Sequence, residues 1–268
     1  MRPQTLQFIT STAGILLSAL SLQAFAQMFS SVQLNAASPG KDGGLVGIAV
    51  LTMPQYQGAK ETRKLIVPAI DYQWANGWFA GASNGIGYNF SSNPAIDFGA
   101  RVTADIGRKE SRSKALRGMG DIKEKAEFGA FLNFNPTQHI SLTSTTRYGS
   151  GSDSKGLIVD LGVSFVEMPT PDLRVGAGVG VSVANENYMQ SFFGVTKAQA
   201  QRSQYAQFKP KAGLRDTHVS AFVSYMINSR TALTLAISSD RLAADAKSSP
   251  LSKTVRSNSG VLALTYHF

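Results

Sequence analysis

The stretch Leu262-Ala263-Leu264-Thr265-Tyr266-His267-Phe268, at the end of the chain, decides the fold. As an extended strand it places Leu262, Leu264, Tyr266 and Phe268 on one face. A soluble protein ending on such a one-sidedly apolar strand would expose an unprotected sheet edge. In a membrane barrel the last strand pairs with the first, so no edge remains. The stretch therefore predicts an outer-membrane β-barrel, with Tyr266 and Phe268 as its membrane-assembly signal.

The N-terminal residues have the pattern of a secretory signal peptide. A positive charge at Arg2 precedes an apolar, small-residue run over residues 9–22, and Ala24-Phe25-Ala26 resembles a cleavage site. We expect a signal peptide over 1–26 and one barrel domain over 27–268. No later stretch reaches the length of about 18 apolar residues that suggests a membrane helix. The chain has no cysteine, which excludes disulfides and a lipoprotein anchor.

Composition agrees with a barrel and restricts the partners. The formal net charge is +9, and 25 glycines accompany a mean hydropathy near zero. A basic chain often binds nucleic acid, but a predicted export signal argues against that partner. We expect contact with outer-membrane lipid and with the phosphates of lipopolysaccharide instead.

Strict two-residue alternation marks the strands. Between residues 95 and 107, for example, Phe98 and Val102 share one face while Arg101 and Thr103 share the other. The same reasoning predicts eleven strands, at 44–53, 62–74, 78–90, 95–107, 122–134, 139–149, 155–168, 172–184, 214–227, 231–241 and 255–268. Short turns are periplasmic and long loops extracellular in such barrels. An N-terminus in the periplasm then needs a further strand, placed at 28–37. The prediction is a transmembrane antiparallel up-and-down β-barrel of about twelve strands.

Charges on the inward faces of neighbouring strands alternate in sign. We expect them to form a belt across the lumen wall. One interpretation is a charge-lined, selective pore, and the other is a small lumen filled by mutually paired polar groups. The predicted belt consists of Arg101, Glu127, Arg147, Asp160 and Arg174.

Two of the predicted extracellular loops are strongly basic. Solvated loops of this kind suit the clamping of lipopolysaccharide phosphates, and an acidic polymer or protein partner is the alternative. The residues predicted to make these contacts are Arg108, Lys109, Arg112, Lys114, Arg117, Lys209 and Lys211.

One motif admits an enzymatic interpretation. His218 and Ser220 lie two residues apart on one strand, as do the imidazole and hydroxyl of outer-membrane phospholipases. However, the apolar residues around Val219 form the lipid face, which turns both groups into the lumen. No third group is found to orient the imidazole. We therefore expect a protein with no catalytic residues, no metal site and no cofactor.

Seven stretches in order resemble the MipA/OmpV family, the MltA-interacting proteins of Gram-negative outer membranes. They begin at Met53-Pro54-Gln55-Tyr56-Gln57-Gly58 and end at Leu264-Thr265-Tyr266-His267-Phe268. Those between are Val67-Pro68-Ala69-Ile70-Asp71-Tyr72, Gly85-Ile86-Gly87-Tyr88-Asn89-Phe90, Leu116-Arg117-Gly118-Met119-Gly120-Asp121-Ile122, Phe192-Phe193-Gly194-Val195 and Ser249-Pro250-Leu251.

The resemblance implies an integral outer-membrane barrel that acts as a scaffold. The partners that it implies are a murein lytic transglycosylase and a penicillin-binding protein that synthesises murein. The scaffold would link these two enzymes in cell-wall maintenance. Other members of the family resemble porins or adhesion-related proteins. The alternative to a scaffold is therefore a narrow, porin-like channel for small polar or anionic solutes.

Overall fold

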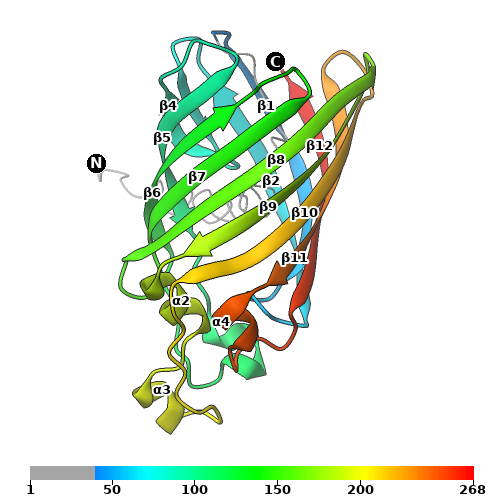
Figure 1. Ribbon diagram of the computed structural model, residues 1–268. Coiled ribbons are helices and arrows are strands. Elements are labelled where there is room, and N and C mark those ends of the chain that lie inside the picture. Colours follow the sequence, from blue (N-terminus) through cyan, green and yellow to red (C-terminus); the bar gives the residue numbers. More distant parts are fainter. Residues whose placement is uncertain (1–39) are drawn as a thin grey trace, which may run out of the picture.

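The computed structural model describes residues 40–268, which form one closed antiparallel barrel of twelve strands (Figure 1). The predicted signal peptide and the predicted strand at 28–37 lie outside the described residues. The strands are β1 (Gly43–Pro54), β2 (Thr62–Gln73), β3 (Trp78–Gly81), β4 (Gly85–Asn89), β5 (Ile96–Asp105), β6 (Lys125–Phe134), β7 (Ile140–Ser150), β8 (Gly156–Thr170), β9 (Leu173–Ala184), β10 (Gly213–Met226), β11 (Thr231–Leu242) and β12 (Arg256–His267).

The alternation seen in the sequence becomes an outer and an inner face. On β8 Leu157 and Leu161 are exposed on the outside, whereas Ile158 and Asp160 are buried inside. Large apolar side chains cover the outside, and Ile66 reaches 72% exposure. Such a surface is stable only where lipid covers it. Among the described helices none is long and apolar enough to cross a membrane.

The terminal strand closes the barrel, as predicted. β12 pairs with β1 from Leu45 opposite His267 to Thr52 opposite Gly260. Beyond β12, the backbones of Gly44 and Phe268 exchange two hydrogen bonds of 3.0 Å. The first strand of the barrel is therefore β1, which pairs with both β2 and β12.

The prediction of a single strand at 78–90 is wrong, because this segment is a short hairpin of β3 and β4. Gly85 adopts a left-handed backbone conformation (φ +78°), which ends the extended run. The hydroxyl of Ser83 donates to Asp71 Oδ1 at 2.6 Å and fixes the turn. This hairpin supplies the twelfth strand. The start of β1 and the end of β12 therefore lie at the same end of the barrel, and no strand at 28–37 is needed to bring them there. The hairpin also reverses the direction expected for the strands before residue 78.

The two ends of the barrel differ, as the sequence predicts. Short turns and the C-terminus lie at one end, at the top of Figure 1, which we expect to face the periplasm. An aromatic girdle marks it, with ring centroids 5.2–5.9 Å apart along Trp78, Tyr88, Phe90 and Phe98. The long loops at the other end carry η1 (Glu110–Arg112), η2 (Lys114–Leu116), α2 (Glu186–Phe193), α3 (Lys197–Gln201) and α4 (Ala244–Ser248).

Candidate functional site

Arg147 of β7 is the centre of a buried polar network in the lumen. Its guanidinium donates to Asp160 of β8 at 3.0 Å and to Glu127 of β6 at 3.5 Å. The side chains of all three are at most 6% exposed. They meet because they lie on the inner faces of three adjacent strands. Two carboxylates thus hold one buried cation, which satisfies charges that would otherwise be costly away from water.

The network continues from Asp160 to the loop end of the barrel. Asp160 Oδ1 accepts a hydrogen bond of 2.6 Å from Ser182 Oγ, which accepts in turn from Arg215 at 3.1 Å. Arg215 is ion-paired with Asp216 and donates to the Tyr188 hydroxyl at 3.0 Å. A β-bulge between residues 214 and 216 disrupts the pairing of β10 with β9 and turns Arg215 inward.

The predicted belt is only partly an ion-paired belt. Glu127, Arg147 and Asp160 are in direct contact, but the guanidinium of Arg101 lies over the Phe131 ring, 5.9 Å from its centroid. Arg174 lies nearer the short turns, over the ring of Phe222 at 4.9 Å. The cation that follows Asp160 along the network is therefore Arg215 rather than Arg174. The sequence analysis missed Arg215 because strict alternation would turn it outward when Asp216 faces inward.

His218 does have an orienting group, contrary to the sequence analysis. Asp216 Oδ1 lies 3.2 Å from its Nδ1, two residues earlier on the inner face of β10. The other oxygen of Asp216 contacts Arg215. His218 and Ser220 are 5% and 2% exposed, so they face the lumen and not the lipid. No cluster of at least three His, Asp or Glu side chains suited to a metal ion occurs within residues 40–268.

An apolar cluster lines part of the opposite wall of the lumen. Small and aliphatic side chains of β1, β2, β11 and β12 point inward and form a cluster with Phe222 of β10. The lumen therefore has an ion-paired network on one side, over β6 to β10, and an apolar cluster on the other. The buried members of the apolar cluster are Ala49, Leu51, Val67, Ala82, Phe222, Ala236, Val261 and Ala263.

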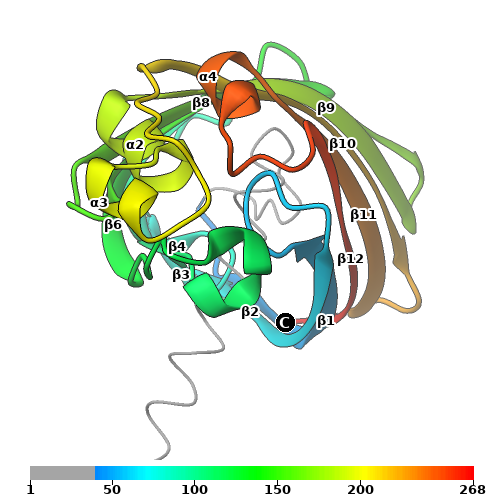
Figure 2. The same cartoon turned by 90° about the horizontal axis from the view of Figure 1, so that it is seen from below.

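The long loops form a structured cap at the extracellular end, defined here as residues 55–61, 106–124, 185–212 and 243–255. Figure 2 shows its helices arranged around the mouth of the barrel. The cap has hydrophobic cores of its own, and one joins Met119, Val195 and Leu251 from three different loops. A second core packs α2 and α4 against the ends of the strands. The loops are thus held to one another and to the wall.

Four of the seven family-like stretches meet in this cap. The Tyr56 hydroxyl donates to the Leu251 carbonyl at 2.9 Å, and Ser249 Oγ donates to the Phe193 carbonyl at 2.6 Å. Gln199 of α3 donates to the carbonyl of Met119 at 2.7 Å. Burial disfavours the phenolate form of Tyr56 and raises its pKa to about 12. The phenol therefore remains a hydrogen-bond donor throughout the physiological range.

The predicted basic contact residues differ in their exposure. Arg108 is a correction, because it is 3% exposed and donates to the Phe192 carbonyl at 2.8 Å inside the cap. Its burial lowers its pKa to about 10. Arg112 is half-buried, and Lys209 forms a surface ion pair with Glu186 at 3.0 Å. The exposed remainder, Lys109, Lys114, Arg117 and Lys211, stays a prediction of lipopolysaccharide contact.

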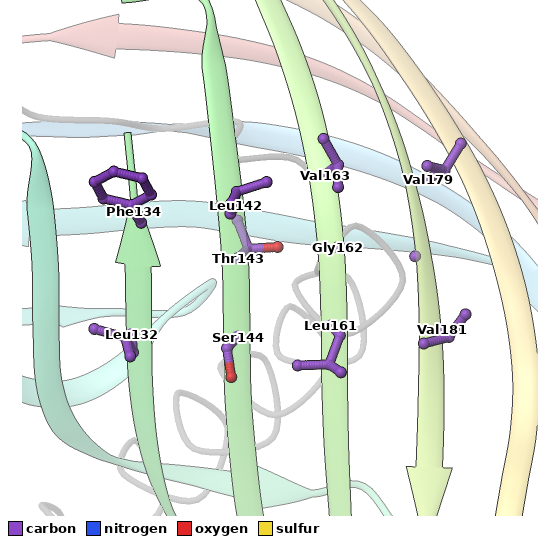
Figure 3. Close-up of a pocket in the computed structure, with 11 residues that line it drawn as sticks. Leu132, Phe134, Leu142, Thr143, Ser144, Leu161, Gly162, Val163, Val179 and Val181 are labelled. Atoms are coloured by element: carbon purple, nitrogen blue, oxygen red, sulfur yellow. The ribbon is translucent and has the colours of Figure 1, made fainter. Parts of the chain in front are cut away.

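A depression of about 560 Å³ lies on the wall across β6 to β9 (Figure 3). It forms where Ser144 is smaller than its outward-facing neighbours Leu132, Leu142 and Leu161. Its lining is almost entirely apolar and belongs to the lipid-facing surface. An acyl chain fills such a surface, so the depression is not a lumen site.

Comparison with solved structures finds porins and outer membrane channels among the similar proteins. A KdgM porin in complex with disordered oligogalacturonate aligns with TM-score 0.43 and 10% identity, over 84% of this chain and 99% of the porin. The COG4313 outer membrane channel from Pseudomonas putida F1 aligns with TM-score 0.46 and 9% identity, over 87% and 97%. None of the curated proteins compared with the chain matches it. The family model described as MltA-interacting protein MipA matches residues 46–268, and the chain therefore belongs to the MipA family.

Proposed function

We propose that this barrel is a non-enzymatic scaffold of the outer membrane, held there to bring murein enzymes together. The observation that carries the proposal is the cap, whose loops share hydrophobic cores over the mouth of the barrel. A buried ion-paired network lies below it. Both features stabilise a closed structure more than they suit a water-filled pore.

The family description supplies the class of partner. A protein described as MltA-interacting binds a murein lytic transglycosylase, and a murein-synthesising penicillin-binding protein is the second expected partner. Periplasmic partners reach only the short-turn rim, where Trp78, Met168 and Phe268 are 50–59% exposed. We infer that this rim is the docking surface, and that the N-terminus reaches the periplasm through export by the predicted signal peptide.

Site-specific photocrosslinking in living cells tests the scaffold. A photoreactive residue at Ser229, in the exposed turn after β10, should give adducts that contain a murein hydrolase or synthase. The matched position Gln204 is equally exposed but belongs to the cap, and it should give none. Adducts of murein enzymes from Gln204 alone, or from neither position, would contradict the proposal.

One observation favours a narrow channel for anionic solutes as the second candidate. Arg101 points into the lumen, and its Nε forms no hydrogen bond with any residue in 40–268. A guanidinium with a donor to spare is suited to a passing anion. Conductance measurements distinguish this channel from the closed scaffold.

A further inference from the structure

The wall of the barrel is incomplete between β2 and β5. A membrane-spanning strand needs about 9–11 residues, but β3 has four and β4 has five. β2 pairs with β3 only over Asp71–Gln73, and β5 pairs with β4 only as far as Val102. The hairpin therefore ends inside the membrane. Between the hairpin and the loop end, no described strand lies between β2 and β5.

The free edge of β2 carries polar backbone groups at the level of the outer leaflet. The carbonyl of Ile70 accepts from the Ala82 N–H at 2.8 Å, which shows that Ile70 faces the hairpin side. Residues two and four positions earlier, Pro68 and Ile66, face the same way. Pro68 has no N–H, as suits an edge, but Ile66 and Lys64 present both groups. No backbone partner for them occurs among residues 40–268. Hydrocarbon cannot satisfy these groups, so this edge is suited to a polar ligand.

Positive charge gathers at the same break. Arg63 lies on β2 beside this edge, and its buried Nε has no hydrogen-bond partner within the described residues. Arg112 is in the loop after β5, and this loop packs on the loop that precedes β2, because Leu116 shares a core with Tyr56 and Ala59. Arg112 also donates to the Gly107 carbonyl at 3.3 Å and lies near Asp121 and Glu124. Guanidinium groups bind phosphate well.

The inner surface next to the break is apolar. Val67 is buried in the apolar cluster of the lumen, and Leu65 packs against it. Both residues are on the inner face of β2 and lie farther from the loop end than Arg63. A ligand that enters here thus meets cations at the level of the headgroups and aliphatic side chains deeper in the membrane.

We propose that the break between β2 and β5 is a lateral portal that binds a phosphate-bearing lipid of the outer leaflet. Arg63 and Arg112 hold the phosphate of the lipid. The free edge of β2 contacts its polar glycerol region, and Leu65 and Val67 contact an acyl chain. This site is separate from the periplasmic rim, so it goes beyond the scaffold and does not depend on it.

Native mass spectrometry of the full-length barrel in nonionic detergent tests the portal. Phosphatidylglycerol and diacylglycerol with identical acyl chains, the second without a phosphate, are added separately, and bound lipids are counted. We expect wild type to bind phosphatidylglycerol about tenfold more tightly, as one charge-assisted contact provides. The double variant Arg63→Gln, Arg112→Gln should lose this preference. The control Lys155→Gln, Lys247→Gln, which removes two exposed charges elsewhere, should keep it.

Two results would overturn the portal. One is equal binding of the two lipids by wild type, and the other is a preference that survives in the double variant. Arg112→Gln alone is measured as well, because it lies outside the barrel wall and spares the strands if Arg63→Gln fails to fold. An excess of inorganic phosphate is the last arm. Complete displacement of the lipid by phosphate would show an ion site and contradict a lipid portal.

Discussion

At the scale of single residues, one buried cation organises the lumen. Arg147 contacts Asp160 at 3.0 Å and Glu127 at 3.5 Å, and Asp160 accepts a further hydrogen bond from Ser182. Alternation and strand order were enough to predict that these three charges face one another. They were not enough to predict Arg215, since a bulge changes which face a residue occupies. Single-residue predictions fail where the backbone departs from a regular period.

The unequal contacts of Arg147 predict unequal costs of mutation. Asp160→Asn removes the negative charge from the shorter contact of the guanidinium, and we expect a loss of about 3–5 kcal/mol in the free energy of unfolding. Glu127→Gln keeps the shorter contact and should cost about 1–3 kcal/mol. Urea unfolding of the barrel in lipid vesicles measures both. A larger loss for Glu127→Gln would show that Asp160 is not the main partner.

A second prediction concerns the pH dependence of the cap. Glu110 accepts hydrogen bonds from the backbone N–H groups of Gly118 (3.0 Å) and Gly120 (2.6 Å), which lower its pKa. Because the folded pKa lies below the unfolded one, the carboxylate stabilises the loop above about pH 4.3. This stabilisation is lost as the pH falls through the folded pKa. Limited proteolysis within 106–124 should accelerate in acid for wild type.

The matched variant for this prediction is Glu110→Gln. It should be cleaved faster than wild type at neutral pH, and it should show no further acceleration in acid, since no carboxylate remains to titrate. Equal cleavage of the two proteins at neutral pH would show that the Glu110 carboxylate does not stabilise the loop.

At the scale of elements, most strands follow from the two-residue period, and the loops do not follow from it. Ten of the predicted strands correspond to single strands of the barrel. The hairpin at 78–90 was missed because one left-handed glycine and one hydrogen bond to Asp71 interrupt a segment of strand-like composition. The cap was not predicted, because its cores join residues up to 132 positions apart, such as Met119 and Leu251. Local pattern carries no information on such contacts.

The terminal strand gives a prediction at this scale. Deletion of Phe268 removes two backbone hydrogen bonds to Gly44 and a ring stacked on Tyr72 at 6.1 Å. The barrel should then assemble poorly, and protein should accumulate in the periplasm. Heat-modifiable migration on gels measures the folded fraction, with Phe268→Tyr as a control that keeps the ring and the backbone. Normal migration of the truncated chain would show that the seam closes without it.

At the scale of the whole molecule, the barrel is built from two unlike ends and an unlike pair of walls. The short-turn rim is compact and ringed by aromatic side chains, and the loop end is capped by packed helices. Inside, an ion-paired network on one wall faces an apolar cluster on the other. Several stretches that carry the family resemblance, far apart in sequence, meet in the cap, while two others border the break between β2 and β5. These stretches could be identified from the sequence, but which of them contact one another could not be predicted from it.

The orientation predicts which positions are accessible from outside the cell. Cysteines at Gln204 and Lys247, both exposed in the cap, should react with an impermeant maleimide on intact cells. A cysteine at Gln138, exposed in the turn before β7, should react only after the outer membrane is opened. The chain has no native cysteine to interfere. Reaction of the Gln138→Cys variant on intact cells would show that the barrel has the opposite orientation in the membrane.

Conductance in a planar lipid bilayer tests the central claim of a closed, capped barrel most directly. The cap and the Arg147 network predict that the folded wild-type protein inserts without stable single-channel currents. Insertion is verified in parallel by heat-modifiable migration of the reconstituted protein. The expected result is a current that stays at the bilayer baseline, and stable anion-selective channels from wild type would contradict the closed scaffold and establish the channel in its place.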